Sequence, residues 1–215
     1  MSDTQELSKQ VKNKELLSTI TPDMALQMMK EGNDRFVKKD MIEREHEWHI
    51  RETIDSQHPY AIVLGCIDSR VEPSILFDQG IGDLFIARIA GNIINQDILG
   101  SMEYACAVSG SKLVLVLGHT SCGAVKGAID NVVLDNLSPS LRHIQLAAER
   151  VKTAEGFDRT AKNLEFVDLV SYKNVEQSIN DIRNQSPILR TLEQDGKIII
   201  TGAIYDHSTG AVHFC

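Results

Sequence analysis

Two short apolar runs, each followed by a loop that carries metal-ligand side chains, constrain this chain more than any other feature. The run at 60–64, Tyr-Ala-Ile-Val-Leu, leads into Gly-Cys-Ile-Asp-Ser-Arg at 65–70. The run at 113–117, Leu-Val-Leu-Val-Leu, leads into Gly-His-Thr-Ser-Cys-Gly at 118–123. Continuous apolar runs of this length are typical of parallel strands that are buried on both faces of a sheet. We therefore expect two strands whose loops leave the sheet at the carboxyl ends of the strands.

Helical patterns separate the expected strands, and this alternation predicts an α/β fold. Further strands are expected at 84–88 and 197–203, and a turn at 206–210 should return the chain as an antiparallel strand at 211–214. The expected core is a mostly parallel central sheet, with four parallel strands plus a C-terminal antiparallel strand, flanked by helices. The helices expected around it start near residue 73 and cover 97–109, 122–131, 138–151 and 163–184, with one more that runs to about 195.

An N-terminal helical arm precedes the first expected strand. Thr21-Pro22-Asp23 is a strong helix start, because the hydroxyl caps, proline suits the first helical position and the acid lies near the positive end. The helix that follows places apolar side chains between Ala25 and Phe36 along one side. We expect residues 1–58 to form this arm and residues 59–215 to form the α/β domain. The apolar stripe of the arm must pack on the α/β body or on another subunit.

Composition and charge exclude several classes of protein. The formal net charge of −8 argues against binding to nucleic acid or to an anionic membrane. No apolar run reaches the roughly 18 residues that cross a bilayer, and the polar start lacks the features of a signal peptide. We expect a soluble, cytoplasmic protein. In a reducing compartment, the 4 cysteines are better explained as ligands or buried thiols than as a disulfide framework.

The two loops hold the ligands of one metal site if they meet in space. Neighbouring strands at the point where strand order reverses would bring Cys66, His119 and Cys122 together. Two thiolates and an imidazole form a zinc site that leaves the fourth position to water or substrate, and zinc lowers the pKa of bound water to about 7. Asp68 can reach the same metal or its water, and Arg70 can hold it ionised in a bidentate pair. Alternatively, Asp68 occupies the fourth position and closes the site, or the pair only braces the loop.

The loops also carry a resemblance to a known family. The motifs Cys-Ile-Asp-Ser-Arg-Val at 66–71 and Gly-His-Thr-Ser-Cys-Gly at 118–123 are similar to those of the β-class carbonic anhydrases. The resemblance implies a zinc enzyme in which metal-bound hydroxide hydrates CO2 reversibly to bicarbonate and a proton. Beyond the two motifs, the similarity extends through residues 25–36, 85–92, 100–105 and 202–212.

Residue roles follow from this resemblance. It implies that Cys66, His119 and Cys122 bind Zn²⁺ and that Asp68 and Arg70 form the catalytic dyad. It also implies that the substrate, CO2 or bicarbonate, contacts other loop residues. The substrate contacts expected on this basis are Gln79 and Gly123, with a plain turn residue as the alternative for Gln79.

The resemblance further implies a homodimer, or a dimer of dimers, in which the N-terminal helices embrace the partner subunit. Two other functions stay open at this point. The same zinc site would support hydrolysis of a CO2 analogue such as COS or CS2, and a protein with this site could bind zinc or bicarbonate without catalysis. The presence of both Asp68 and Arg70 weighs against the last alternative, because a passive site does not need the dyad.

Overall fold

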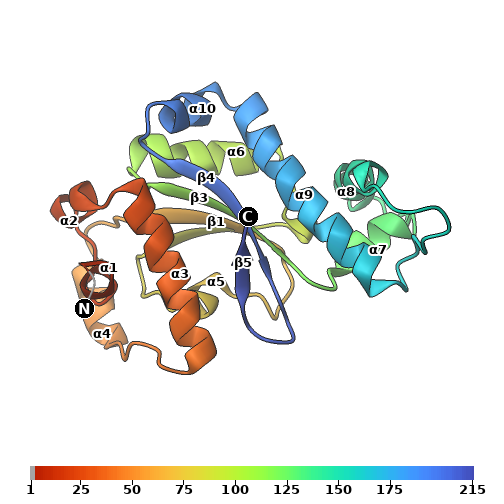
Figure 1. Cartoon of the computed structure of the whole chain (residues 1–215). Coiled ribbons are helices and arrows are strands. Elements are labelled where there is room, and N and C mark those ends of the chain that lie inside the picture. The colour runs from red at the N-terminus through yellow and green to blue at the C-terminus, as the bar shows by residue number, and fades with distance from the viewer. Residues whose placement is uncertain (1–2) are drawn as a thin grey trace.

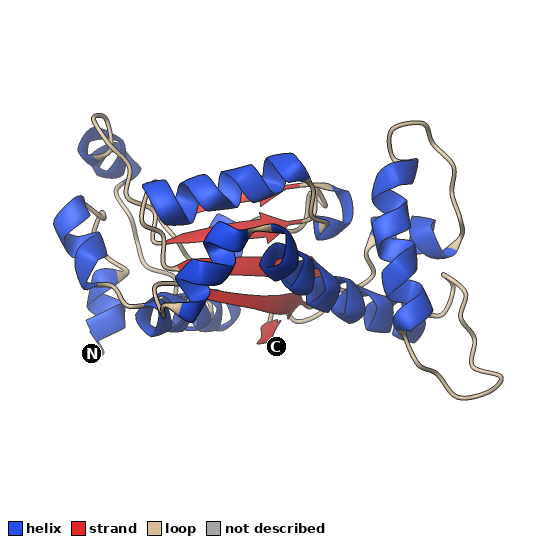
Figure 2. Cartoon of the chain, turned by 90° about the horizontal axis from the view of Figure 1, so that it is seen from above, coloured by secondary structure: helices blue, strands red, loops and turns tan. Residues whose placement is uncertain are grey.

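The protein is an α/β structure built on one five-stranded sheet (Figures 1 and 2). The computed structural model describes residues 3–215. Its strands lie in the order β2-β1-β3-β4-β5, and all neighbours are parallel except the pair of β4 and β5. This arrangement confirms the predicted fold class. The strands are β1 (Ala61–Gly65), β2 (Leu84–Arg88), β3 (Leu113–His119), β4 (Ile199–Tyr205) and β5 (Val212–Phe214).

Helices cover both faces of this sheet, and Figure 1 shows the strands between them. A 3₁₀ turn at Ala90–Asn92 follows β2, and a π-helical turn at Tyr104–Val108 extends the helix before β3. No helix in the described part of the chain is long and apolar enough to span a membrane. The helices are α1 (Asp3–Leu7), α2 (Lys14–Thr19), α3 (Pro22–Lys38), α4 (His46–Glu52), α5 (Pro73–Leu76), α6 (Gln96–Glu103), α7 (Gly123–Ile129), α8 (Ser138–Arg150), α9 (Leu164–Gln185) and α10 (Pro187–Gln194).

Alternate residues of the strands enter two separate cores. Val63 and Leu115 face the N-terminal helices, whereas Leu64 and Val116 face α6, α9 and α10. A third core lies beyond the sheet, between α7, α8 and α9. Strand β4 starts later than predicted because the N–H of Lys197 bonds to the carbonyl of Leu192, in the turn after α10. The sheet is therefore buried on both faces, as its continuous apolar strands require.

The N-terminal arm packs on the sheet of its own chain. Helix α3 starts as predicted, with the Thr21 hydroxyl accepting from the N–H of Met24 and Pro22 at the first position. Ala25, Met28 and Met29 are fully buried in the core that they share with β1, β3 and β4. The α/β body thus covers the apolar stripe of α3. Contact between the arm and a partner subunit stays a prediction, and so does the division at residue 58.

Buried ion pairs also join the arm to the body. Lys12 Nζ lies 2.9 Å from Asp83 Oδ1, with both side chains almost fully buried. Arg35 Nε lies 2.5 Å from Asp78 Oδ2, and Arg44 contacts the other oxygen of the same carboxylate. Removing one partner of such a pair leaves an uncompensated buried charge, which costs about 3–5 kcal/mol. These ion pairs therefore hold the arm in position, in addition to the apolar packing of α3.

Candidate metal centre

The two loops predicted to hold a metal converge at the carboxyl edge of the sheet. Strands β1 and β3 are neighbours, with Gly65 beside Leu117. The sulfur atoms of Cys66 and Cys122 and a ring nitrogen of His119 lie within 4.8 Å of one another, and all three residues are buried. These three residues could hold a metal ion. The predicted convergence of the three residues is present in the fold.

The imidazole of His119 is oriented as a metal ligand requires. Its Nδ1 lies 3.0 Å from the carbonyl oxygen of Thr120, which can only accept, so Nδ1 carries the proton of the neutral ring. Its Nε2 is buried and has no hydrogen-bond partner among the described residues. A buried polar atom without a partner is costly. A metal ion bound at Nε2 would remove this cost, so the residues fit such an ion.

The two thiols form a coupled pair. A hydrogen bond from the Cys122 thiol lowers the pKa of Cys66 to about 4, and the thiolate of Cys66 together with burial raises the pKa of Cys122. The N–H of Gly91 also donates to the sulfur of Cys66, at 3.3 Å. One thiolate and one thiol therefore face His119, and a metal ion would displace the remaining proton.

Gly91 is a contributor that sequence reasoning missed. Its φ of +72° is left-handed, and a Cβ there would overlap Ile144 of α8. Glycine is thus required for the backbone N–H to approach the sulfur. The segment Phe-Ile-Ala-Arg-Ile-Ala-Gly-Asn at 85–92 belongs to the resemblance described above. Nothing within this segment indicated that the N–H of Gly91 faces the sulfur of Cys66.

Arg88, at the end of β2, is a second supporting residue, for which the sequence had favoured a structural role in shaping the loop and the dimer interface. Its Nε donates to the carbonyl of Cys66 at 2.9 Å, and its Nη2 donates to the carbonyl of Asp68 at 2.6 Å. The guanidinium also pairs with Glu72 at 3.2 Å. Arg88 therefore holds the backbone of the first ligand loop from the neighbouring strand.

Asp68 lies beside the three candidate ligands and is paired with Arg70. One carboxylate oxygen accepts from the backbone N–H and the Nε of Arg70, both at 3.0 Å, and the other accepts from Nη2 at 2.8 Å. These bonds hold the pKa of Asp68 well below its usual range. Asp68 Oδ2 lies 3.9 Å from His119 Nε2. Of the two states that the sequence left open, the structure has the carboxylate on Arg70.

His207, in the turn after β4, also reaches this site. Its Nε2 lies 3.8 Å from Asp68 Oδ1, and its ring packs edge-on against His119 with 4.9 Å between ring centroids. Burial lowers the pKa of His207, which favours the neutral ring. The sequence Asp-His-Ser-Thr-Gly indicated only a turn, so sequence reasoning gave His207 no role.

A cavity of about 520 Å³ opens next to the ligands. Cys66, Asp68 and Gly123 line it, and its other walls are almost entirely apolar. Gln79 is not among its lining residues: the Tyr60 hydroxyl donates to its side-chain oxygen at 2.8 Å, and its amide nitrogen donates to the carbonyl of Phe77 at 2.5 Å. The structure therefore brings Gly123 to the site but not Gln79 of the same chain, and both substrate contacts stay predictions.

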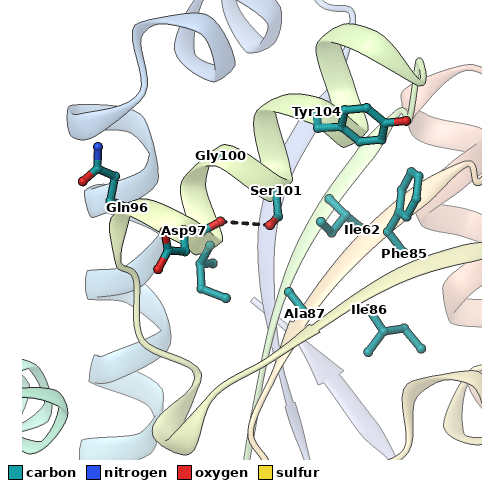
Figure 3. Close-up of a pocket in the computed structure, with 10 residues that line it drawn as sticks. Ile62, Phe85, Ile86, Ala87, Gln96, Asp97, Gly100, Ser101 and Tyr104 are labelled. Atoms are coloured by element: carbon teal, nitrogen blue, oxygen red, sulfur yellow. Dashed lines mark hydrogen bonds between the residues drawn. The ribbon is translucent and has the colours of Figure 1, made fainter. Parts of the chain in front are cut away.

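A larger cavity, of about 850 Å³, contains none of the predicted site residues (Figure 3). It lies between the edge strand β2 and helix α6, and Phe85 and Tyr104 pack edge-on there with 6.1 Å between ring centroids. The hydroxyl of Ser101 bonds to the carbonyl of Asp97 of the same helix at 2.9 Å. Among the described residues, neither group of side chains that could hold a metal ion lies at this cavity.

Comparison with known proteins agrees with the geometry of the metal centre. The family model for carbonic anhydrase matches residues 61–212. The carbonic anhydrase of Mycolicibacterium smegmatis is 35% identical over 192 residues, which cover 89% of this chain and 92% of that protein. Carbonic anhydrase 2 of Mycobacterium tuberculosis is 34% identical over 196 residues, with 88% and 90% covered.

Solved structures give the class within this family. The crystal structure of the β-carbonic anhydrase CafA of Aspergillus fumigatus is 25% identical with a TM-score of 0.70, and the match covers 90% of this chain and 89% of that chain. The fold is also shared with the β-carbonic anhydrase of Coccomyxa, at 24% identity and a TM-score of 0.68, over 88% of this chain and 83% of that chain. The chain is an enzyme of the β-class carbonic anhydrase family.

Proposed function

We propose that this enzyme catalyses the reversible hydration of CO2 to bicarbonate and a proton, with zinc held by Cys66, His119 and Cys122. The observation that carries the proposal is the buried convergence of these three ligands around the unpartnered Nε2 of His119. Two sulfurs and one imidazole nitrogen are a ligand set that zinc prefers when a fourth position is left open. When bound there, zinc supplies a Lewis acid that lowers the pKa of a water molecule to about 7.

We propose that Asp68 orients the reacting water. Its ionised Oδ2 faces the ligand set, 3.9 Å from His119 Nε2. A carboxylate there accepts a hydrogen bond from an O–H of the water, so that a lone pair of the water oxygen would face the cavity. Arg70 keeps the carboxylate ionised and turned in this direction through its paired bonds.

The cavity beside Asp68 suits a small apolar substrate. Ala90, Val132 and Leu137 are among the side chains that form its walls. An apolar wall offers no hydrogen bonds to water and therefore favours CO2 over water. At Gly123, no atom lies within 4 Å of the position that a Cβ would take, so a side chain there would project into open space beside the ligands. We propose that Gly123 keeps this space free for substrate.

The second copy of this chain is the partner that we propose for the edge strand β2. Ile86 and Tyr104 are exposed apolar side chains beside the 850 Å³ cavity. Unpaired strand edges with apolar surroundings readily pair with another chain. A neighbour of the same fold from Sordaria macrospora, 20% identical with a TM-score of 0.66, is described as tetrameric. A homodimer or dimer of dimers is thus the expected state, and a monomer in sedimentation velocity would contradict it.

The test of the function compares ligand variants with a matched cysteine control. Cys66→Ala and His119→Ala should each lose both bound zinc and CO2 hydration, measured by elemental analysis and by stopped-flow with a pH indicator. Cys106→Ala removes a buried thiol outside the ligand cluster and should keep both. A ligand variant that is free of zinc and fully active would refute the assignment. No feature of the described site favours COS or CS2 hydrolysis or passive binding.

A further inference from the structure

His207 has no part in the mechanism proposed above, although its side chain lies against Asp68. The ring is enclosed by Asp68, by His119 and by Tyr205, whose ring centroid is 5.1 Å away. The side chain is only 15% exposed. A half-buried imidazole with a polar edge toward a carboxylate is positioned to interact with it.

The hydroxyl of Thr120 determines which ring nitrogen carries the proton. Its oxygen accepts the backbone N–H of His207 at 3.1 Å and lies 3.3 Å from the Nδ1 of the same residue. The structure gives this hydroxyl no second acceptor among the residues described, so its own hydrogen points to Nδ1. Nδ1 is then an acceptor, and the proton of the neutral ring is on Nε2.

The Nε2–H selected in this way faces Asp68. Nε2 is buried and has no hydrogen-bond partner in the described part of the chain, and Asp68 Oδ1, at 3.8 Å, lies just beyond hydrogen-bond range. A small rotation of either side chain closes this distance. The other side-chain donor to Asp68 is Arg70, whose side chain is 57% exposed. Exposed ion pairs hold their geometry weakly, since solvent competes for both partners.

We propose that His207 is a positioning residue, whose Nε2–H holds the carboxylate of Asp68 beside the metal ligands. The inference rests on the proposed function for its effect on catalysis. Arg70 fixes the carboxylate from the solvent side, and His207 fixes it from the protein side. Together with the three bonds from Arg70, this donor restricts the carboxylate of Asp68 to one orientation.

The turn that carries His207 does not itself require histidine. Asp206 accepts from the N–H and the hydroxyl of Ser208, at 2.8 and 2.7 Å, and Gly210 takes the left-handed position with φ of +77°. The backbone N–H of His207 bonds to Thr120, and this bond does not depend on the side chain at 207. Side-chain replacements at 207 therefore leave the bonds of the turn intact, and their effects report on the ring.

The first test observes the ring without any reaction. Zinc-free protein labelled with ¹⁵N-histidine is studied by long-range ¹H–¹⁵N correlation, with His207→Gln to identify the signals. His207 should show a protonated Nε2 and an unprotonated Nδ1, and Thr120→Val should convert it to a mixture of tautomers. A protonated Nδ1 in the unaltered protein, or an unchanged tautomer in Thr120→Val, would overturn the inference.

The second test compares two replacements in the zinc-loaded enzyme. Glutamine can present an N–H near the position of Nε2, whereas phenylalanine keeps the ring shape without a donor. His207→Phe should lower kcat/KM about tenfold, as expected for the loss of a hydrogen bond to a charged group, while His207→Gln stays within about threefold of the unaltered enzyme. His213→Phe, at an exposed histidine of β5, is the matched control and should change nothing.

The outcomes of the two tests separate this inference from the proposed function. Equal losses in His207→Phe and His207→Gln, or no loss in either, would overturn the positioning role. Zinc content and far-ultraviolet circular dichroism identify a variant that has lost metal or fold. If the unaltered protein does not hydrate CO2, the proposed function fails, and the tautomer measurement still decides whether His207 presents its donor to Asp68.

Discussion

Replacing Gly32 with alanine should destabilise the protein, although alanine is the better helix former. Gly32 lies inside α3, where the helix crosses the segment after α5. A Cβ at this position would overlap the carbonyl oxygen of Phe77 and lie 2.7 Å from its carbonyl carbon. These are backbone atoms, so no side-chain rotation can relieve the contact. Either α3 or the 77–79 segment must move.

The magnitude follows from two opposing effects. Alanine gains about 1 kcal/mol over glycine in a helix interior. Overpacking costs about 1–3 kcal/mol, and rigid backbone neighbours place this contact at the upper end. The net loss is therefore about 2 kcal/mol. In a chain of this size, 1 kcal/mol shifts the midpoint of thermal unfolding by about 2–4 °C. Gly32→Ala should thus lower Tm by about 4–8 °C.

Gly127→Ala is the matched control, because Gly127 also lies inside a helix. A Cβ there would meet Leu141 at 3.8 Å, an ordinary contact, so only the gain in helix propensity remains. This variant should unfold at the same temperature as the unaltered protein or a few degrees higher. Both are measured by circular dichroism at one protein concentration, because association shifts Tm. A Gly32→Ala protein as stable as the unaltered one would refute the reasoning.

Two further predictions concern the metal centre. Zinc affinity should rise about tenfold per pH unit near neutral pH, because Cys122, whose pKa is raised, must lose one proton when zinc binds. Competition with a chelator at several pH values measures this slope. An affinity that does not change with pH would contradict a protonated Cys122 in the zinc-free protein. Arg70→Lys keeps the charge but not the paired bonds to Asp68. It should lower kcat/KM about tenfold with zinc retained, and an unchanged value would mean that the pair only braces the loop.

The pH dependence of the Asp68–Arg70 pair has a definite sign. Because the pKa of Asp68 is lowered in the folded protein, the pair stabilises the fold fully above the unfolded value near 3.8 and loses this contribution as pH falls through the lower folded value. Asp68 therefore stays ionised wherever the enzyme works near neutral pH. Activity lost between pH 8 and pH 6 would come from another group of the site.

The sequence was sufficient for the sheet and for the three ligands. The apolar runs that form β1 and β3 are typical of buried parallel strands, and parallel neighbours bring the loops that follow them to one edge. Both loops carry their ligand side chains within a few residues of the strand end. The sequence analysis assumed that β1 and β3 are neighbours, and on that assumption local chemistry brings Cys66, His119 and Cys122 together, as the structure has them.

The supporting groups could not be predicted in the same way. Arg88, Gly91 and His207 reach the loops from three other segments, and each has an ordinary local explanation as a strand end or a turn residue. Which atom of the ligand loops each one contacts depends on the packing of helices against the sheet. No pattern within one segment contains this information. The strands could therefore be predicted from the sequence, whereas these long-range contacts could not.

These supporting contacts hold the three proposed ligands in position through the fold itself. The N–H of Gly91 fixes the sulfur of Cys66, and the carbonyl of Thr120 fixes the ring of His119. Between the second-loop ligands, Ser121 has a left-handed φ of +55°, and its N–H is held by Asp168 of α9 at 2.8 Å. A non-glycine residue persists in this conformation only where its surroundings impose it. The contacts to Cys66, His119 and Ser121 thus come from the fold itself, and such preorganisation would keep the rearrangement needed for binding and for reaction small.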